Sequence, residues 1–243
     1  MEAQVFERVE KKYLITDKQK TKLIRLIRKH MQKDKYFRSE VANLYFDTDA
    51  YDLIIQSIDR PEFKEKLRAR SYGGYDRVFL EIKTKLRGRD VNTGYKRRIM
   101  LTRKDFTKFT KKHTTAVELT TSAAKSPHNL QIAREIDYLV AHFGLKPQIL
   151  ITYDRESYKD KQNFRITFDE NLRYRNKNLT LTRGKRDKIY FKDKQCIIME
   201  VKAHGIIPLW LAQALSEEHI YPQQFSKIGK VYTKLISKKG KNV

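Results

Sequence analysis

The chain has 243 residues with a net charge of +24, and 34% of its residues are charged. So much positive charge repels itself unless an anion offsets it, so we expect a polyanionic partner such as nucleic acid, an anionic membrane surface or a phosphate-rich molecule. The single cysteine, Cys196, excludes an intrachain disulfide and any cysteine-based zinc site made by this chain alone. There is no signal peptide and no apolar run long enough to span a membrane, which predicts a soluble cytoplasmic protein.

The first half of the chain predicts a strand, a helix and then several strands. Residues 5–15 have strand character, and Thr16 with Gln19 forms a capping box for a helix over about 17–32. Glycine and asparagine separate the later segments, which indicates an antiparallel meander, whereas residues 105–125 predict helix or loop. The strands of this half are expected at 41–48, 64–72, 77–85 and 94–101.

The second half predicts a helix, then four strands, with a last helix near the C-terminal end. Ser126 and Pro127 open an amphipathic helix that Gly144 and Pro147 close. A last amphipathic helix is expected over about 207–218. Strands are expected at 148–158, 164–174, 188–191 and 196–203. Because no repeat or linker interrupts the chain, we predict one domain over residues 1–243.

Charged residues recur at every second position of the predicted strands, so they share one face of each strand. Lys66, Arg68 and Arg70 are the clearest case, with small or apolar residues between them. The other such sets are Arg8, Glu10 and Lys12; Glu81, Lys83 and Lys85; Lys96 and Arg98; Tyr153 and Arg155; Arg165, Thr167 and Asp169; and Glu200 and Lys202. The opposite faces are apolar and can pack against helices, which predicts an α+β fold.

An exposed charged face is usually only solvated. That reading weakens when seven strands carry mostly arginine and lysine on one face. A sheet curved into a barrel around this face would bury the cations, which is prohibitive unless a polyanion and water fill the space. We therefore predict an antiparallel β-barrel that forms a polar, cation-lined tunnel for phosphates, with helices packed outside.

Four carboxylates lie among these cations: Glu10, Glu81, Asp169 and Glu200. They are either ion-pair partners that hold the cations extended or oxygen ligands for Mg²⁺ or Mn²⁺. We favour metal binding for Glu200 and ion pairing for Glu10 and Glu81. The sequence has no glycine-rich phosphate loop, so side chains would have to hold a nucleotide.

The ordered motifs resemble a known family over nearly the whole chain. They are RVEKKY at the N-terminus, NLYFDT, LRAR, FLEIKTK, KRR, TYDRESY, FRITFD, MEVK and FSK. This set resembles the polyphosphate polymerase domain of the vacuolar transporter chaperone family and its bacterial relatives, which belong to the triphosphate tunnel metalloenzymes. The resemblance implies transfer of the γ-phosphate of ATP to a growing polyphosphate chain with release of ADP, assisted by Mn²⁺ or Mg²⁺.

The resemblance also implies roles for individual residues. Expected catalytic residues are Lys12, Arg68, Arg70, Lys83, Lys96, Arg155 and Arg165, and expected substrate-binding residues are Arg8, Lys85, Arg98, Tyr153, Lys202, Ser226 and Lys227. Glu200 is the expected metal ligand. The implied partners are ATP and polyphosphate, with no specific nucleic acid and with any membrane partner left undefined.

Two residues depart from the fungal pattern, and two other functions stay open. Lys85 stands where the fungal enzymes place a histidine, and Gln224 stands where they place a lysine. The first alternative function is a tunnel triphosphatase acting on tripolyphosphate or nucleoside triphosphates, and the second is a non-enzymatic polyanion-binding module. Three motifs favour the polymerase over the triphosphatase. They are the YxR pair of Tyr153 and Arg155, the FSK motif near the C-terminus, and the N-terminal RxExK, where CYTH-type triphosphatases have ExExK.

Overall fold

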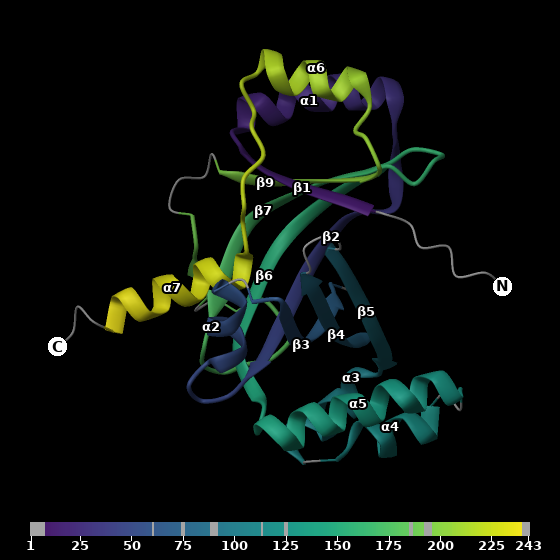
Figure 1. Cartoon of the computed structure of the whole chain (residues 1–243), viewed down its shortest axis with the longest axis vertical. Helices are drawn as coiled ribbons and strands as arrows, with labels where there is room; N and C mark the ends of the chain where they lie inside the picture. Colours follow the sequence, from purple (N-terminus) through teal and green to yellow (C-terminus); the bar gives the residue numbers. More distant parts are fainter. Residues whose placement is uncertain are drawn as a thin grey trace. The chain divides into compact units, whose positions relative to one another are not determined.

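A computed structural model describes residues 8–59, 61–73, 76–87, 92–112, 114–123, 126–184, 187–191 and 196–239. Its strands are β1 (Arg8–Ile15), β2 (Gln32–Asp47), β3 (Phe63–Tyr72), β4 (Val78–Arg87), β5 (Asn92–Leu101), β6 (Lys146–Lys159), β7 (Arg165–Arg175), β8 (Lys188–Ile189) and β9 (Ile197–His204). Its helices are α1 (Asp17–His30), α2 (Asp52–Ile58), α3 (Arg103–Lys111), α4 (Ala116–Ala123), α5 (Pro127–Phe143), α6 (Leu209–Glu217) and α7 (Lys227–Lys239) (Figure 1). The fold is therefore α+β, as predicted.

The strands form an antiparallel sheet that does not close. Their hydrogen-bonded order is β1-β9-β7-β6-β2-β3-β4-β5, with β8 beside β7. Across the described ranges β1 and β5 are the two ends of this order, so an open sheet replaces the closed barrel that we expected. The sequence of β5 gives a physical reason, because Lys96, Arg97 and Arg98 follow one another on it and charged edge strands resist further pairing.

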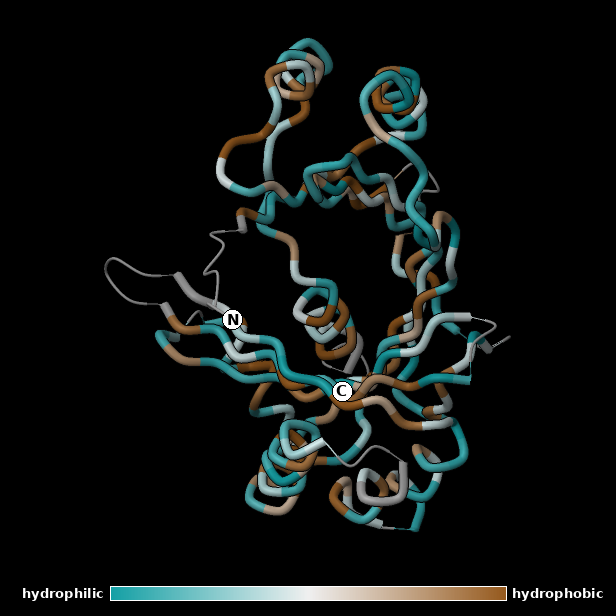
Figure 2. The backbone as a smooth tube through the Cα atoms, turned by 90° about the vertical axis from the view of Figure 1, so that its right-hand side faces the viewer, coloured by the Kyte–Doolittle hydropathy of each residue, from teal (hydrophilic) through white to brown (hydrophobic). Residues whose placement is uncertain are grey.

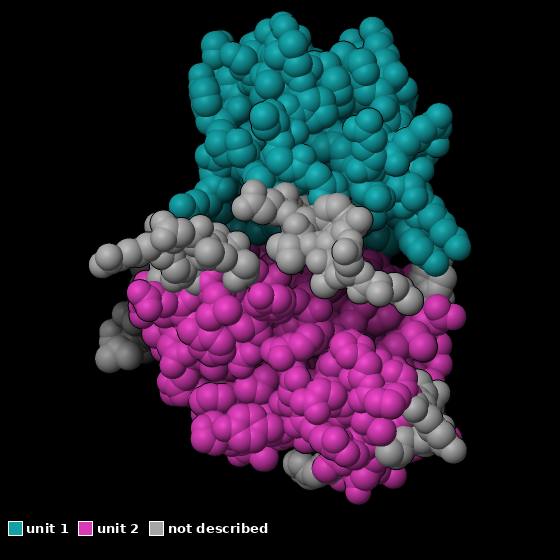
Figure 3. Space-filling model, turned by 45° about the vertical axis from the view of Figure 1, so that its right-hand side comes forward, with its two compact units in different colours: residues 1–40, 153–173, 189–226 teal, residues 41–152, 174–188, 227–243 magenta. Residues whose placement is uncertain are grey.

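The chain divides into two compact units (Figure 3). Unit 1 comprises residues 1–40, 153–173 and 189–226, and unit 2 comprises residues 41–152, 174–188 and 227–243. Strands β2 and β6 each contribute residues to both units. The single domain expected over residues 1–243 stays a prediction.

In unit 1, helices α1 and α6 cover the apolar face of the strands (Figure 1). Leu23 and Ile27 of α1 are buried against the inward side chains of the sheet, which include Phe168 and Met199. The predicted capping box is present, because the Thr16 hydroxyl accepts from the Gln19 amide and the Gln19 side chain accepts from the Thr16 amide at 2.9 Å. Hydrophilic and hydrophobic segments alternate along the strands and around the helices, as amphipathic elements require (Figure 2).

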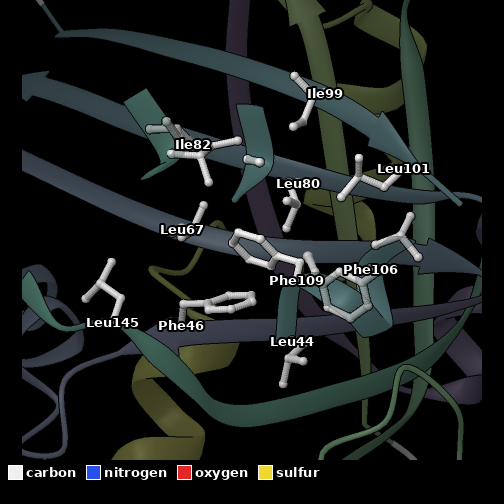
Figure 4. Packing of buried hydrophobic residues seen from close by; sticks show 14 of the residues in the cluster. Leu44, Phe46, Leu67, Leu80, Ile82, Ile99, Leu101, Phe106, Phe109 and Leu145 are labelled. Atoms are coloured by element: carbon white, nitrogen blue, oxygen red, sulfur yellow. The ribbon is translucent and has the colours of Figure 1, made fainter. Parts of the chain in front are cut away.

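In unit 2, helices α3, α4 and α5 supply the residues that cover the apolar face of β2 to β5. Leu67, Leu80 and Ile82 project from successive strands toward Phe106 and Phe109 of α3 (Figure 4). Helix α5 begins and ends as predicted. The Ser126 hydroxyl accepts from the Asn129 amide, and Gly144 takes the left-handed conformation at φ 62°, which glycine adopts with little strain.

Four elements differ from the sequence predictions. Helix α2 was not predicted, because its seven residues are too few to show a helical period clearly. Strand β2 begins at Gln32 rather than residue 41, because its first half is charged and gives little apolar signal. The strand expected over 188–191 shortens to β8, and α7 follows the FSK motif, where Gly229 interrupts the helical pattern. Over the described ranges, no helix combines the length and the apolar character that crossing a membrane requires.

Candidate functional site

In unit 2, strands β3, β4 and β5 align cations directly across the sheet. Leu67 and Ala69 point into the core at 1% and 0% exposure, so the alternating cations of β3 lie on the opposite face. The register pairs Lys66 with Lys83 and Lys83 with Lys96. We call these three residues the lysine row. Like charges directly opposite one another on neighbouring strands destabilise a sheet, and an anion bound over the row would relieve that repulsion.

One buried carboxylate lies beside the lysine row. Glu81 is 1% exposed, and the register places it between Arg68 and Arg98. Arg68 Nε donates to Glu81 Oε2 at 2.8 Å, whereas Lys96 Nζ and Arg98 Nη1 lie 3.7 Å and 3.9 Å from Oε1. We call Glu81 with Arg68, Lys96 and Arg98 the Glu81 cluster. Three cations surround one carboxylate, so the cluster keeps an excess of positive charge.

The electrostatics of the Glu81 cluster keep its acid ionised and make one lysine easier to deprotonate. Burial alone would raise the pKa of Glu81, but Arg68, Arg70 and Lys96 outweigh it and lower the pKa. The pKa of Lys96 is lowered by burial and by the neighbouring arginines, against the opposing effect of Glu81. Glu81 Oε1 accepts no hydrogen bond from any described residue and is buried. Glu81 therefore holds the cations in place without neutralising them.

Asn43 is a site residue that the sequence analysis missed. Its side chain is 2% exposed, and its Oδ1 accepts a hydrogen bond from Arg70 Nε at 2.8 Å. The register also places Asn43 opposite Arg70. An asparagine within the apolar strand NLYFDT was the signal that could have revealed it. Lys85 continues the same face of β4 and is exposed, opposite Lys64.

Unit 1 carries a second charged face, centred on Arg155 of β6. Arg155 Nε and Nη2 donate to the two oxygens of Asp169 at 2.6 Å and 2.7 Å, and Nη2 lies 3.5 Å from Glu200 Oε2. Lys202 Nζ lies 3.7 Å from the same Glu200 oxygen. We call these four residues the Arg155 cluster. The guanidinium also lies 5.3 Å from the ring of Tyr153, which is buried.

The Arg155 cluster is largely shielded from solvent. The side chains of Arg155 and Asp169 are 14% and 0% exposed. Burial would lower the pKa of Arg155, but Asp169 and Glu200 outweigh it and hold that pKa well above its ordinary value. A buried bidentate arginine–carboxylate pair fixes both side chains. Arg155 therefore holds its acidic neighbours in position and also borders a cavity of about 430 Å³.

Lys12 and Arg165 lie on the same face of unit 1, opposite Glu200 and Lys202 in the strand register, whereas Lys227 belongs to unit 2. Lys12 Nζ lies 3.3 Å from Glu10 and donates to the Phe225 carbonyl at 3.2 Å, which links β1 to the FSK motif. Arg165 lies 3.3 Å from Asp34 of β2, a partner that the sequence analysis did not identify. Ser226 is exposed immediately before α7, whose first residue is Lys227. The side chain of Arg8 lies outside the described residues.

Two carboxylates of unit 1 have the chemistry of a divalent-cation site. Glu10 and Glu200 both approach the Lys202 ammonium, at 3.5 Å and 3.7 Å. Over the described ranges no three acidic, histidine or cysteine residues form a cluster that could hold a metal alone. Mg²⁺ is commonly held by one or two carboxylates together with substrate phosphates, so two carboxylates fit such a cation when a polyphosphate completes its coordination.

Comparisons with known proteins identify the family of the chain. The family model of the VTC domain matches residues 7–236. Over 189 residues the chain is 27% identical to subunit 4 of the vacuolar transporter chaperone complex of Schizosaccharomyces pombe (strain 972), covering 70% of this chain and 26% of that protein. The chain therefore spans about a quarter of the length of that relative.

Among solved structures, a putative adenylyl cyclase from Hippeastrum with a dominant triphosphatase activity aligns with a TM-score of 0.57 at 16% identity. The alignment covers 93% of this chain and 96% of that one, so the two share a fold. A weaker similarity links the PH1819 protein from Pyrococcus horikoshii OT3, at a TM-score of 0.45, 13% identity, and 93% and 99% coverage. Because the VTC match extends over most of the sequence, the chain belongs to the VTC domain family.

Proposed function

We propose that this chain is an ATP-dependent polyphosphate polymerase that moves the γ-phosphate of ATP to the end of a polyphosphate chain and releases ADP. Membership of the VTC domain family and the two charged faces support this proposal. The observation that carries it is the lysine row. Three lysines directly opposite one another place a line of positive charge across three strands, and a chain of phosphates matches that line in charge and in its repeating form.

Phosphoryl transfer suits a site made of fixed cations. A terminal phosphate oxygen of the growing chain attacks the γ-phosphorus, and the bond from that phosphorus to the β–γ bridging oxygen breaks, so that ADP leaves. The reaction needs in-line placement and neutralised charge more than a covalent nucleophile. In this proposal the lysine row and the Glu81 cluster bind phosphates, Asn43 orients Arg70, and the Arg155 cluster positions Glu200.

Glu10 and Glu200 are the residues that would hold Mn²⁺ or Mg²⁺. The cation would neutralise charge on the phosphoryl oxygens. Replacing Glu200 with glutamine should raise the Mn²⁺ concentration for half-maximal turnover by about tenfold or more, by analogy with losses seen when metal-site groups are removed. The matched control is Glu217→Gln, on an exposed residue of α6. An unchanged metal requirement in Glu200→Gln would contradict the assignment.

A second prediction uses the lowered pKa of Lys96. Its ammonium loses its proton below the ordinary value of 10.5, so affinity for metal-free tripolyphosphate should fall as the pH rises through that lowered pKa. Lys96→Arg should shift this alkaline decline upward, because arginine stays protonated over the whole range. Calorimetric titration at several pH values checks this. Identical profiles for the two proteins would show that another group controls binding.

A triphosphatase is the second candidate, in which water takes the place of the attacking phosphate chain. The triphosphatase stays a candidate because the chain shares its fold with the Hippeastrum protein, which has a dominant triphosphatase activity. A non-enzymatic polyanion-binding module is the third reading of the same cations. These functions differ in what happens to ATP.

The first experiment incubates the purified chain with ATP and either Mn²⁺ or Mg²⁺, with an EDTA-treated sample as the control, and assays ADP. ADP release that requires metal is the expected result. Tight binding of tripolyphosphate, with neither ADP release from ATP nor phosphate release from tripolyphosphate, would reject both enzymatic functions and leave the binding module.

A further inference from the structure

A basic stripe runs along the outer surface of α1 in unit 1. Lys18, Lys22, Arg25 and Lys29 are separated by four, three and four residues, so they lie on one side of the helix. All four are exposed, whereas Leu23 and Ile27 are buried on the opposite side. Lys22 also pairs with Glu218, its Nζ lying 2.6 Å from Oε1, so Lys18, Arg25 and Lys29 supply most of the positive charge of the stripe. Asp17 is the helix's one acidic residue. The stripe belongs to the helical side of the sheet, away from the Arg155 cluster.

Helix α6 lies beside α1 in the opposite direction. The rings of His30 and Trp210 stack at 4.6 Å, which joins the end of α1 to the start of α6. At the other end, Gln19 Nε2 donates to the Glu218 carbonyl at 3.0 Å. Figure 1 shows the two helices side by side. They form one layer, and this layer brings the beginning of α6 next to the basic end of α1.

The beginning of α6 exposes two large aliphatic side chains. Ile206, three residues before α6, is 92% exposed, and Leu209, its first residue, is 72% exposed; these are the highest values among the exposed large hydrophobic residues of the described ranges. Water is an unfavourable environment for such side chains, and neighbouring exposed aliphatic groups commonly mark an interaction surface. We call the basic stripe together with Ile206 and Leu209 the α1–α6 surface.

We propose that the α1–α6 surface binds the surface of an anionic lipid bilayer. Lysine and arginine attract anionic headgroups, while exposed aliphatic side chains insert at the boundary of the acyl chains. Nucleic acid fits less well, because its recognition away from base edges uses cations and aromatic stacking and gains little from isoleucine or leucine. This proposal does not depend on the reaction proposed above.

The test measures cosedimentation of the full chain with vesicles of phosphatidylcholine alone and of phosphatidylcholine mixed with phosphatidylserine. We expect binding to the mixed vesicles only, weakened by salt. Each basic residue near an anionic membrane contributes about fivefold to partitioning, so the double variant Lys18→Glu, Arg25→Glu should bind about 25-fold less or weaker still. The matched control, Lys104→Glu with Lys111→Glu on α3, makes the same change in charge at exposed positions of unit 2.

The aliphatic contribution has its own variant. The double variant Ile206→Ser, Leu209→Ser should bind mixed vesicles more weakly, and the binding that is left should be more sensitive to salt. The control variant Ile58→Ser, Ile236→Ser changes residues that are 42% and 45% exposed and should bind like the unmodified chain. Lys83→Ala should bind vesicles like the unmodified chain, which separates this surface from the lysine row. Circular dichroism checks that each variant is folded.

Three results would overturn the proposal. The first is no binding of the unmodified chain to mixed vesicles. The second is an equal loss in the α3 control, which would show that net charge alone drives binding. The third is binding of single-stranded RNA that depends on the stripe, together with vesicle binding that does not, which would assign the surface to nucleic acid.

Discussion

Replacing Lys83 with alanine should lower kcat/KM for ATP by about 100-fold or more, the usual effect of removing one group that stabilises developing charge. Lys83 is the middle member of the lysine row and lies opposite a lysine on each neighbouring strand. Because its side chain is exposed, the chain should keep its fold and a free energy of unfolding within about 1 kcal/mol of the original. Steady-state ATP turnover and urea unfolding measure the two quantities.

The matched control for this prediction is Lys104→Ala, which removes another exposed lysine, on α3. It should leave turnover unchanged. Lys83→Arg should recover part of the activity, because it restores the charge with a different geometry. Full activity of Lys83→Ala would mean that the lysine row is only exposed to water and does not bind substrate. The polymerase proposal would then lose the observation on which it mainly rests.

Replacing Arg155 with alanine should destabilise the chain by about 3 kcal/mol or more, because it leaves a buried carboxylate without its partner. Asp169 is 0% exposed, and both of its oxygens accept hydrogen bonds from Arg155. Turnover should also fall, since Glu200 loses a contact. The free energy of unfolding from urea titration is the quantity to measure.

A double variant separates the ion pair from packing. Arg155→Met with Asp169→Leu removes both charges, and it should be more stable than Arg155→Ala alone because apolar residues often replace a buried pair at little cost. If Arg155→Ala abolishes turnover with unchanged stability, Arg155 contacts phosphate directly and is not an anchor for Asp169.

The alternation of residues along the strands predicted a charged face and an apolar face for each strand, but it did not predict that the cores would form two separate clusters. Every second residue from Lys66 to Arg70 is a cation, and the residues between them are buried. The alternation of side chains along a strand depends only on neighbouring residues, so it can be predicted without knowing the tertiary structure. The same is true of the capping box at Thr16 and of the glycine end of α5.

Pairings between distant strands could not be predicted in the same way. The sequence favoured ion pairing for Glu81 but did not identify its partners, and the register places it opposite Arg68 and Arg98. Closure of the barrel was also beyond local patterns, because it depends on which strands meet at the edges. The partners Asn43 and Asp34 escaped notice since a single polar residue in a strand usually has no special role.

The most direct measurement of the central claim follows the γ-phosphate of ATP. The chain is incubated with ATP labelled at that phosphate and with Mn²⁺, products are separated by length on a gel, and ADP and free phosphate are assayed in the same samples. We expect labelled chains that grow with time, with ADP formed in step and little free phosphate. Free phosphate equal to ADP, with no labelled chains, would contradict the polymerase and identify a triphosphatase.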